Sequence, residues 1–360
     1  MKKTILALLL ICTLLLSGCA SMLERDYLSV EPYDPESAGD NPSALRVESY
    51  WDLVDAILYL VSIGEEHGVL SLYNYTSQDV EADLARACGE VVQEEPLGAY
   101  AVDYIRHDCS FIVSYYEANI YISYRRSPEQ IDSIVSVTGA NAIRQELSKT
   151  MSSFSTEAAL RISYFVEDEA YIQELVRQAY YDSPSTALGM PEVKVALYPA
   201  VGYQRIVEIN LTYPENLSTM RRRSQELKEL AQSQMPQVPT AENLYAALDG
   251  VAVHERTGRS TAYDALTGGV VNSEGAALAY KFLCDQAGIE CHIVQGELNG
   301  RSHFWNIVLN NRQVYQHVDL TAELFSLSDH QLTDAGSYKW DSMEYPSCPT
   351  VRSSETNAEN

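Results

Sequence analysis

The chain has 360 residues and a formal net charge of −25, because 50 acidic side chains oppose only 25 basic ones. A surface of this charge repels phosphate backbones and anionic lipid headgroups. The composition therefore excludes nucleic acid as a partner and excludes membrane binding through charge.

The first segment has the layout of an export signal. A pair of lysines precedes an apolar run, residues 5–16, that is too short to span a bilayer. Two small residues then precede Cys19, which is typical of a cleavage site. The pattern resembles a bacterial lipoprotein signal, which implies that Cys19 becomes the first mature residue and carries acyl chains that hold the protein on the cell membrane, outside the cytoplasm. Cleavage removes two lysines and moves the charge from −25 to −27, so the attachment has to come from the lipid.

A tether and then a globular region are expected next. Residues 20–45 are rich in Pro, Asp and Ser and have no apolar period, which predicts a flexible segment. From Ser49, a good helix N-cap residue, apolar side chains recur at helical spacing, beginning with Leu53 and Ile57. A strand, a second helix and two further strands follow, up to Tyr124.

The same order of elements is repeated. At an offset of 91 residues, Tyr73 corresponds to Tyr164 and Leu84 to Leu175. We interpret residues 47–127 and 138–215 as two copies of an α-β-α-β-β unit. Chance similarity between two α+β stretches is the alternative, and the matched order favours duplication.

The C-terminal third predicts a helix followed by three short strands. The helix begins at or beside Ser273 and ends at Gly288, and Asn299-Gly300 is a strong hairpin signal between the first two strands. A three-residue loop, Asn310–Arg312, would place His303 opposite Asp319 on neighbouring strands, whereas a two-residue loop would put them on opposite faces. We predict the three-residue loop.

These residues carry a family resemblance. The runs TAYDAL, SEGAALAYKFLCDQAGIEC, SHFWN and VYQHVDLT resemble the transglutaminase-like superfamily, which has a papain-like fold. The resemblance covers residues 241–348. It implies a helix packed on an antiparallel sheet and catalytic positions at Ser273, His303 and Asp319, with Trp305 and Asn306 lining the cleft.

Ser273 departs from the family, which has a nucleophilic Cys at this position. A helix N-terminus and an imidazolium store a thiol as a thiolate, whereas a serine needs a general base during attack. Three readings stay open. The favoured one is a degenerate domain that binds a peptide, peptidoglycan or an envelope protein. A working hydrolase or acyl transferase with a Ser273-His303-Asp319 triad is the second, and a scaffold in which the N-terminal repeats bind is the third. Ser273 is also a plausible helix cap.

The cysteines predict one disulfide. Cys88 and Cys109 correspond at the repeat offset to Ala179 and Ala200, and joint absence from the second copy is what a bonded pair would leave. No cysteine has metal-ligand spacing and no cofactor motif is visible, so we predict neither a metal nor a cofactor.

The overall prediction is an α+β protein. Its expected organisation is a signal peptide (1–18), a lipidated Cys with its tether (19–46), two repeats (47–127 and 138–215), a linking helix (217–235), a transglutaminase-like domain (241–348) and a disordered tail (349–360).

Overall fold

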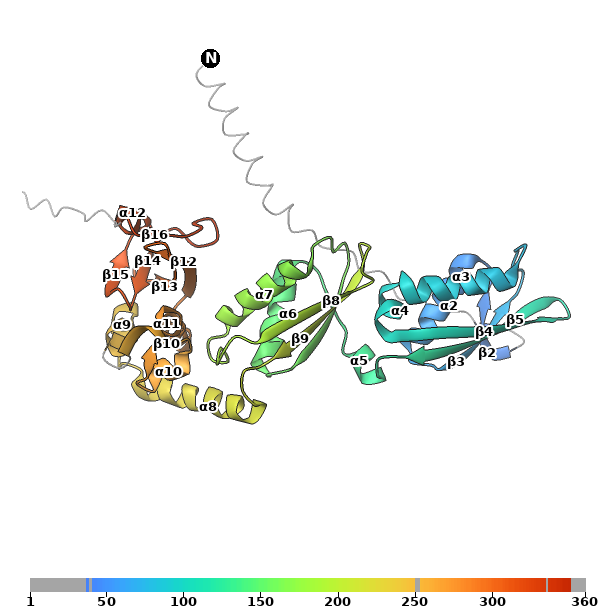
Figure 1. Ribbon diagram of the computed structural model, residues 1–360, viewed down its shortest axis with the longest axis horizontal. Coiled ribbons are helices and arrows are strands. Elements are labelled where there is room, and N and C mark those ends of the chain that lie inside the picture. The colour runs from blue at the N-terminus through green and yellow to red at the C-terminus, as the bar shows by residue number, and fades with distance from the viewer. Residues whose placement is uncertain (1–36, 39–40, 250–252, 335, 351–360) are drawn as a thin grey trace, which may run out of the picture. The chain divides into compact units, whose positions relative to one another are not determined.

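The computed structural model describes residues 37–38, 41–249, 253–334 and 336–350 (Figure 1). The predicted signal peptide, Cys19 and most of the predicted tail lie outside these residues. Within them the chain is a mixed α+β protein, with helices α2 to α12 and strands β1 to β16. Every helix in this part of the chain is too short or too polar to cross a membrane.

Two compact units divide the chain. Among the described residues, the first unit contains residues 37–38, 41–146, 157–175 and 193–210, and the second contains residues 147–156, 176–192, 211–249, 253–334 and 336–350.

A five-stranded sheet with the order β1-β2-β3-β5-β4 occupies the beginning of the first unit. Ser49 caps the first helix, as the position of Ser49 before an apolar helical period predicts. Its side chain accepts the Asp52 N–H, and the Asp52 side chain accepts the Ser49 N–H, which forms a capping box. The elements are β1 (Ser37–Ala38), β2 (Asn41–Val47), α2 (Tyr50–Ser62), β3 (His67–Leu72), α3 (Val80–Gln93), α4 (Pro96–Ala101), β4 (Val102–Ile112) and β5 (Tyr115–Tyr124).

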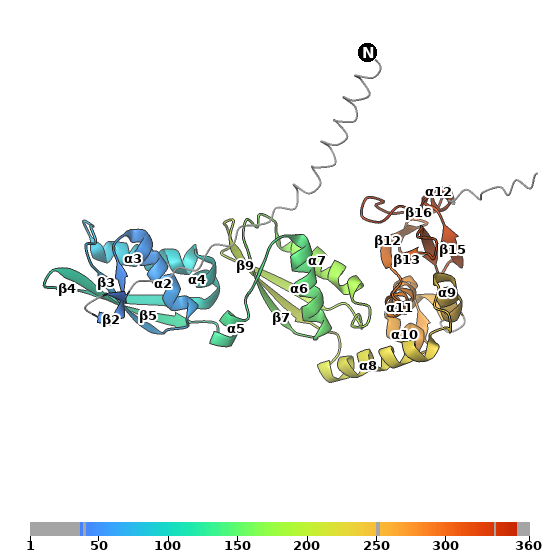
Figure 2. The same cartoon turned by 180° about the vertical axis from the view of Figure 1, so that it is seen from behind.

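A four-stranded sheet with the order β6-β7-β9-β8 follows, and it is seen from behind in Figure 2. In both sheets a parallel pair of strands is extended by an antiparallel strand. The elements are α5 (Pro128–Asp132), β6 (Val135–Val137), α6 (Ala140–Ser152), β7 (Glu157–Ile162), α7 (Glu169–Asp182), β8 (Glu192–Tyr198), β9 (Arg205–Thr212) and α8 (Leu217–Gln234).

Two elements of the first sheet differ from the sequence prediction. Strand β2 lies mostly inside the predicted tether, where it pairs in parallel with β3 and buries Ala44 and Val47 completely. Pairing with a distant strand overrides the local composition here. Helix α4 was not predicted, because its six residues are too few to show a helical period.

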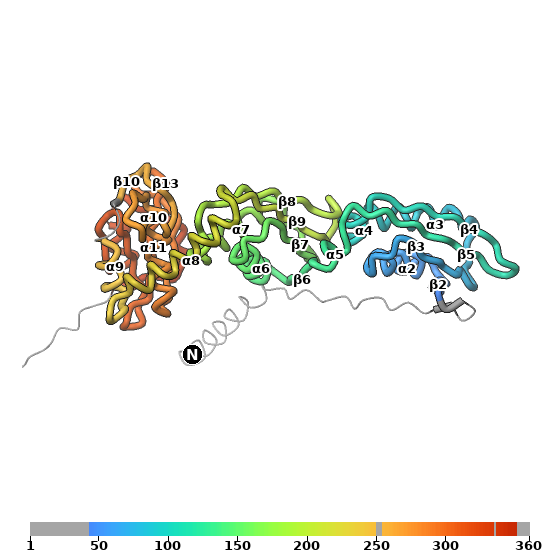
Figure 3. Tube along the Cα trace, turned by 90° about the horizontal axis from the view of Figure 1, so that it is seen from below, coloured from blue at the N-terminus to red at the C-terminus, as the bar shows by residue number. Residues whose placement is uncertain are grey.

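The C-terminal part of the second unit holds a sheet with the order β15-β14-β13-β12-β16. Helix α11 packs on β12 and β13, and Figure 3 shows it grouped with α9 and α10. The elements are α9 (Ala241–Asp249), β10 (Val253–Arg259), α10 (Ala262–Leu266), β11 (Val270–Val271), α11 (Ser273–Gln286), β12 (Cys291–Leu298), β13 (Arg301–Leu309), β14 (Tyr315–Asp319), β15 (Leu324–Leu327), α12 (Asp329–Asp334) and β16 (Tyr338–Lys339).

The turn between β13 and β14 corrects the predicted register. Leu309 pairs with Tyr315, and not with Gln313 as predicted. The Asn310 side chain accepts hydrogen bonds from the Arg312 and Val314 N–H groups, and Gln313 takes the left-handed conformation, with φ at 59°. Five residues, 310–314, therefore lie between the paired Leu309 and Tyr315, where three were predicted. The register therefore moves by two, which keeps His303 and Asp319 on one face.

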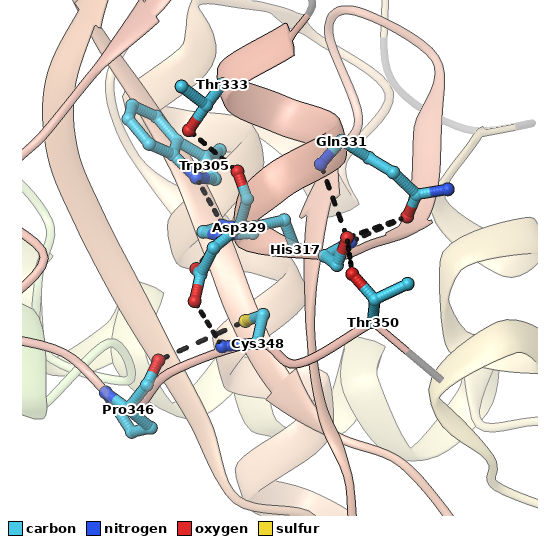
Figure 4. Close-up of polar contacts among 9 residues, drawn as sticks. Trp305, His317, Asp329, Gln331, Thr333, Pro346, Cys348 and Thr350 are labelled. Carbon is cyan, nitrogen blue, oxygen red and sulfur yellow. Dashed lines mark hydrogen bonds and ion pairs between the residues drawn. The ribbon is translucent and has the colours of Figure 1, made fainter. Parts of the chain in front are cut away.

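The C-terminal segment is held against the sheet by one carboxylate. Asp329 accepts hydrogen bonds from the Cys348 N–H at 2.8 Å and from the His317 ring at 2.9 Å (Figure 4). Cys348 and Tyr338 are thereby buried together with Trp305 in a small apolar cluster on the face opposite α11. This segment closes the face of the sheet that carries His303.

Candidate active site

The start of α11 is fixed by Asn272. Its side chain accepts the Gly275 N–H at 3.0 Å and donates to the Ser260 hydroxyl at 2.7 Å, while its backbone N–H donates to the Arg259 carbonyl. Asn272 is thus the helix cap, and Ser273 is the first helical residue. The interpretation of Ser273 as a cap is wrong, so its hydroxyl is left for another partner.

The Ser273 oxygen accepts a hydrogen bond from the Phe304 N–H at 3.3 Å. Gln295 of β12 pairs with Phe304 of β13, but the Gln295 N–H donates to the Tyr345 hydroxyl. Gln295 and Phe304 are therefore a non-hydrogen-bonded pair of the antiparallel ladder. The Phe304 N–H therefore points away from β12, toward β14, whose ladder with β13 ends at Asn306 and Val318. Ser273 occupies the position that a longer β14 would fill. It therefore lies beside His303, which precedes Phe304 in β13.

His303 and Asp319 form a close pair. The His303 Nε2 lies 2.6 Å from Asp319 Oδ2, and the two side chains are 12% and 2% exposed. Asp319 also accepts from the Tyr338 hydroxyl at 2.8 Å and, through its other oxygen, from the Thr321 N–H and hydroxyl and the Ala322 N–H. Five donors thus surround one buried carboxylate.

These donors keep Asp319 ionised. Burial alone would raise its pKa, but the hydrogen bond and charge of His303, with the bonds from Tyr338 and Thr321, outweigh burial and place the pKa below its ordinary value. An ionised Asp319 accepts, so His303 Nε2 carries a hydrogen. In the neutral ring the lone pair is then on Nδ1, which is the arrangement required of a general base.

A cavity of about 670 Å³ brings Ser273 and His303 together. Within the described residues no hydrogen bond joins the two side chains. His254, from β10, also lines this cavity, and both of its ring nitrogens are buried with no hydrogen-bond partner in the part of the chain that the structure covers. His254 was not predicted as a site residue, because it lies in a short strand without a recognisable motif.

Trp305 and Asn306 do not line this cavity, which corrects the cleft prediction. Each is 1% exposed. The Trp305 indole donates to His317 Nδ1 at 3.0 Å, and the Asn306 amide donates to the Ala277 carbonyl of α11 at 3.0 Å. Only the first residues of β13 reach the cavity, and the following ones are covered by the C-terminal segment on one face and by α11 on the other.

The buried cysteines are poor candidates for a relocated nucleophile. Burial raises the pKa of Cys284 well above its ordinary value and raises the pKa of Cys348 to about 12. The thiolate is the reacting form, so such thiols are inert at neutral pH.

Cys88 and Cys109 are free thiols in the structure, and the disulfide predicted between them is not formed. Both contact the same hydrophobic core. Burial raises the pKa of Cys88 to about 12 and raises that of Cys109, which slows oxidation of either thiol. The pairing stays a prediction for the exported protein.

One cluster in the described residues has the composition of a metal site. Ligand atoms of His317, Asp329 and Cys348 lie within 4.8 Å of one another (Figure 4). The Trp305 indole can only donate, however, so His317 Nδ1 accepts and His317 Nε2 carries the hydrogen that it gives to Asp329. That nitrogen has no lone pair for a metal, and the arrangement fits a hydrogen-bonded cluster better than a ligand set.

Comparison with known proteins gives a weak likeness to a solved structure. No family model and no curated protein matches the sequence. A solved structure described as "Crystal structure of a TGase" is similar to part of the chain, at 10% sequence identity and a TM-score of 0.26. The match covers 47% of this chain and 52% of that one, so it spans about half the length of the solved structure. A likeness at this level identifies no family.

Proposed function

We propose that this protein is a lipoprotein, anchored through Cys19 on the outer side of a cell membrane, whose C-terminal domain is transglutaminase-like and binds without turnover. Its partner would be a peptide, a cell-wall fragment or an envelope protein, held in the cavity beside Ser273 and His303. Neither a metal nor a cofactor takes part.

The observation that carries this proposal is the environment of the Ser273 hydroxyl. It replaces the thiol of the family pattern and accepts the Phe304 N–H, with no hydrogen bond to His303 among the described residues. His303 bonds to Asp319 through Nε2, and Tyr338 also donates to this carboxylate. A base that does not contact its nucleophile favours binding over catalysis.

A serine hydrolase or acyl transferase is the second candidate. It is favoured by the 2.6 Å contact between His303 and Asp319 and by the cavity that both Ser273 and His303 line. In this case His303 would remove the Ser273 proton during attack, and Asp319 would orient the ring. Closure around a substrate would have to bring the ring to the hydroxyl.

The N-terminal sheets support a scaffold role for that part of the chain. A duplication is favoured by the shared strand order, in which β2-β3-β5-β4 corresponds to β6-β7-β9-β8. If these units bind the partner and the C-terminal domain only packs, a protein ending at Gln234 should retain all partner capture.

Replacing Ser273 by Cys tests the proposal. The helix N-terminus and the His303 ring should depress the pKa of the introduced thiol, so iodoacetamide at pH 6 should alkylate it about tenfold faster than the same thiol in a His303→Ala background. The wild-type protein gives the background from the other cysteines. Equal alkylation rates in the two backgrounds would mean that His303 does not activate a thiol at position 273, as it would in a thiol enzyme.

A further inference from the structure

Tyr181, at the end of α7, contacts the two elements that carry the candidate site. Its hydroxyl donates to Glu274 Oε1 at 2.9 Å, and its ring lies against Phe304, with the ring centroids 5.6 Å apart. Glu274 directly follows Ser273 in α11, and Phe304 directly follows His303 in β13. The end of α7 belongs to the same compact unit as α11 and β13, so these contacts lie within one unit.

Burial holds Tyr181 in place. Tyr181 is 8% exposed, and its ring packs edge-on against Tyr180, with the centroids 5.2 Å apart. Tyr180 is itself buried, and its hydroxyl accepts the Gly189 N–H at 3.2 Å. Side chains packed in this way keep one rotamer, so the position of the Tyr181 ring is set before any ligand enters the site.

Glu274 anchors the Tyr181 hydroxyl to the start of α11. Burial raises the pKa of Glu274, and the hydrogen bonds from the Tyr181 and Ser260 hydroxyls oppose this rise. The Ser260 hydroxyl also accepts from the side chain of Asn272, the cap of α11, at 2.7 Å. Tyr181 is therefore joined through two hydrogen bonds to the network that fixes the helix start.

Phe304 is the residue whose backbone meets Ser273. Its N–H donates to the Ser273 hydroxyl at 3.3 Å, while its ring lies against Tyr181. The ladder between β13 and β14 ends at Asn306 and Val318, so within the described residues no strand fixes this side of Phe304. The contact between the Phe304 N–H and Ser273 therefore depends on what holds the Phe304 side chain.

We propose that Tyr181 is a positioning residue of the candidate site, which holds Phe304 against α11 so that the Phe304 N–H reaches the side chain at position 273. The ring positions Phe304, and the hydroxyl fixes the ring to α11. The site is then built with a residue of α7 and not from the predicted domain, residues 241–348, alone. This inference deepens the proposed function and rests on it for the role of position 273.

The pH dependence of alkylation in a Ser273→Cys variant of the full chain tests this. The Phe304 N–H stabilises a thiolate at this position and so lowers the pKa of the introduced thiol. Tyr181→Ala removes the ring, so iodoacetamide at pH 6 should react about fivefold more slowly, in keeping with the loss of one hydrogen bond to a charged group. At about pH 10 the thiol is ionised in every variant, and the rates should come within about twofold of one another.

Two further variants separate the ring from the hydroxyl and from general destabilisation. Tyr181→Phe keeps the ring and loses the bond to Glu274, so it should restore most of the rate that Tyr181→Ala loses. An effect through the charge of Glu274 is common to both variants, because both lack the hydroxyl. Tyr203→Ala, at an exposed position, is the control and should leave the rate unchanged. Mass spectrometry of the peptide that contains residue 273 separates its alkylation from that of the native cysteines.

Three outcomes overturn the proposal. They are an unchanged rate at pH 6 in Tyr181→Ala, equal rates in Tyr181→Ala and Tyr181→Phe, and a fivefold loss that persists at about pH 10, which would indicate general disruption of the fold. All of these comparisons keep His303, whereas the test of the proposed function removes it. Failure of this inference can therefore be told from failure of the proposed function.

Discussion

At the scale of single residues, Asp319 organises the candidate site. It is fully buried, it accepts from three side chains and two backbone groups, and its pKa lies below the ordinary value. The sequence predicted the His303–Asp319 pair from alternation along two strands. It did not predict the donor Tyr338, because this residue comes from a two-residue strand that no periodic pattern marks.

Asp319→Asn should destabilise the C-terminal domain by about 2 kcal/mol at pH 7, since hydrogen bonds to a charged group are lost in a buried place. Urea unfolding measures this in a Trp51→Phe background, in which fluorescence reports Trp305 and Trp340. Asp341→Asn, at an exposed position, is the control. An equal loss in both variants would contradict the role given to Asp319.

The contribution of the Asp319 carboxylate to stability should depend on pH. A folded-state pKa below the unfolded value means that the unfolded chain binds more protons in this pH range. The free energy of unfolding therefore decreases as the pH is lowered. The contribution of Asp319 is complete above the ordinary carboxyl pKa of about 3.9 and is lost as the pH drops through the folded-state value. The stability difference between wild type and Asp319→Asn should therefore shrink below about pH 4. A constant difference from pH 7 to pH 3 would argue that Asp319 is not ionised.

At the scale of elements, the β13–β14 turn marks what the sequence could and could not predict. The shared face of His303 and Asp319 followed from the apolar alternation of the strands. The register did not, because it depends on the Asn310 side chain accepting two backbone N–H groups, and Asn310, Asn311 and Arg312 are all acceptable turn residues. Likewise, the helix start was predicted within one residue, but the cap is Asn272 and not Ser273.

Gln313→Gly should stabilise the turn. Gln313 has a φ of 59°, a conformation that costs a residue with a side chain about 1 kcal/mol and glycine much less. The gain should appear as an increase of about 0.5 kcal/mol or more in the free energy of unfolding. Arg312→Gly, at the adjacent exposed position with an ordinary φ, should destabilise the turn. If both changes have the same sign, the turn geometry is wrong.

Asn272→Ala should loosen the start of α11. Loss of the cap costs about 1 kcal/mol, and the Ser260 hydroxyl loses its donor as well. Amide hydrogen exchange at Gly275 and Ala276 should accelerate, whereas exchange near the middle of α11 should change little. Unchanged exchange at Gly275 would show that the cap does not hold the helix start.

At the scale of the whole molecule, the acidic charge and the leader together determine where the protein is expected to work. A chain with a net charge of −25 gains no attraction from an anionic membrane, so under the proposed function any attachment would come from the lipid on Cys19. The mixed α+β class followed from the alternating helical and strand periods. The sheet orders did not, because strands such as β2 and β6 are paired by distant partners and are too short or too polar to be recognised alone.

Cys19→Ala should release the protein from the membrane. In cells fed a labelled fatty acid, the wild-type protein should carry the label and sediment with membranes, and the variant should do neither. Cys12→Ala, within the apolar run of the leader, is the matched control and should keep both properties. Labelling that persists in Cys19→Ala would contradict the lipoprotein assignment.

The reactivity of Ser273 toward a fluorophosphonate, followed by mass spectrometry of the intact wild-type protein, tests whether this serine is a nucleophile. We expect no adduct at Ser273, because its oxygen contacts the Phe304 N–H and not a base. An adduct at Ser273 that disappears in His303→Ala would contradict it and would establish a working serine site.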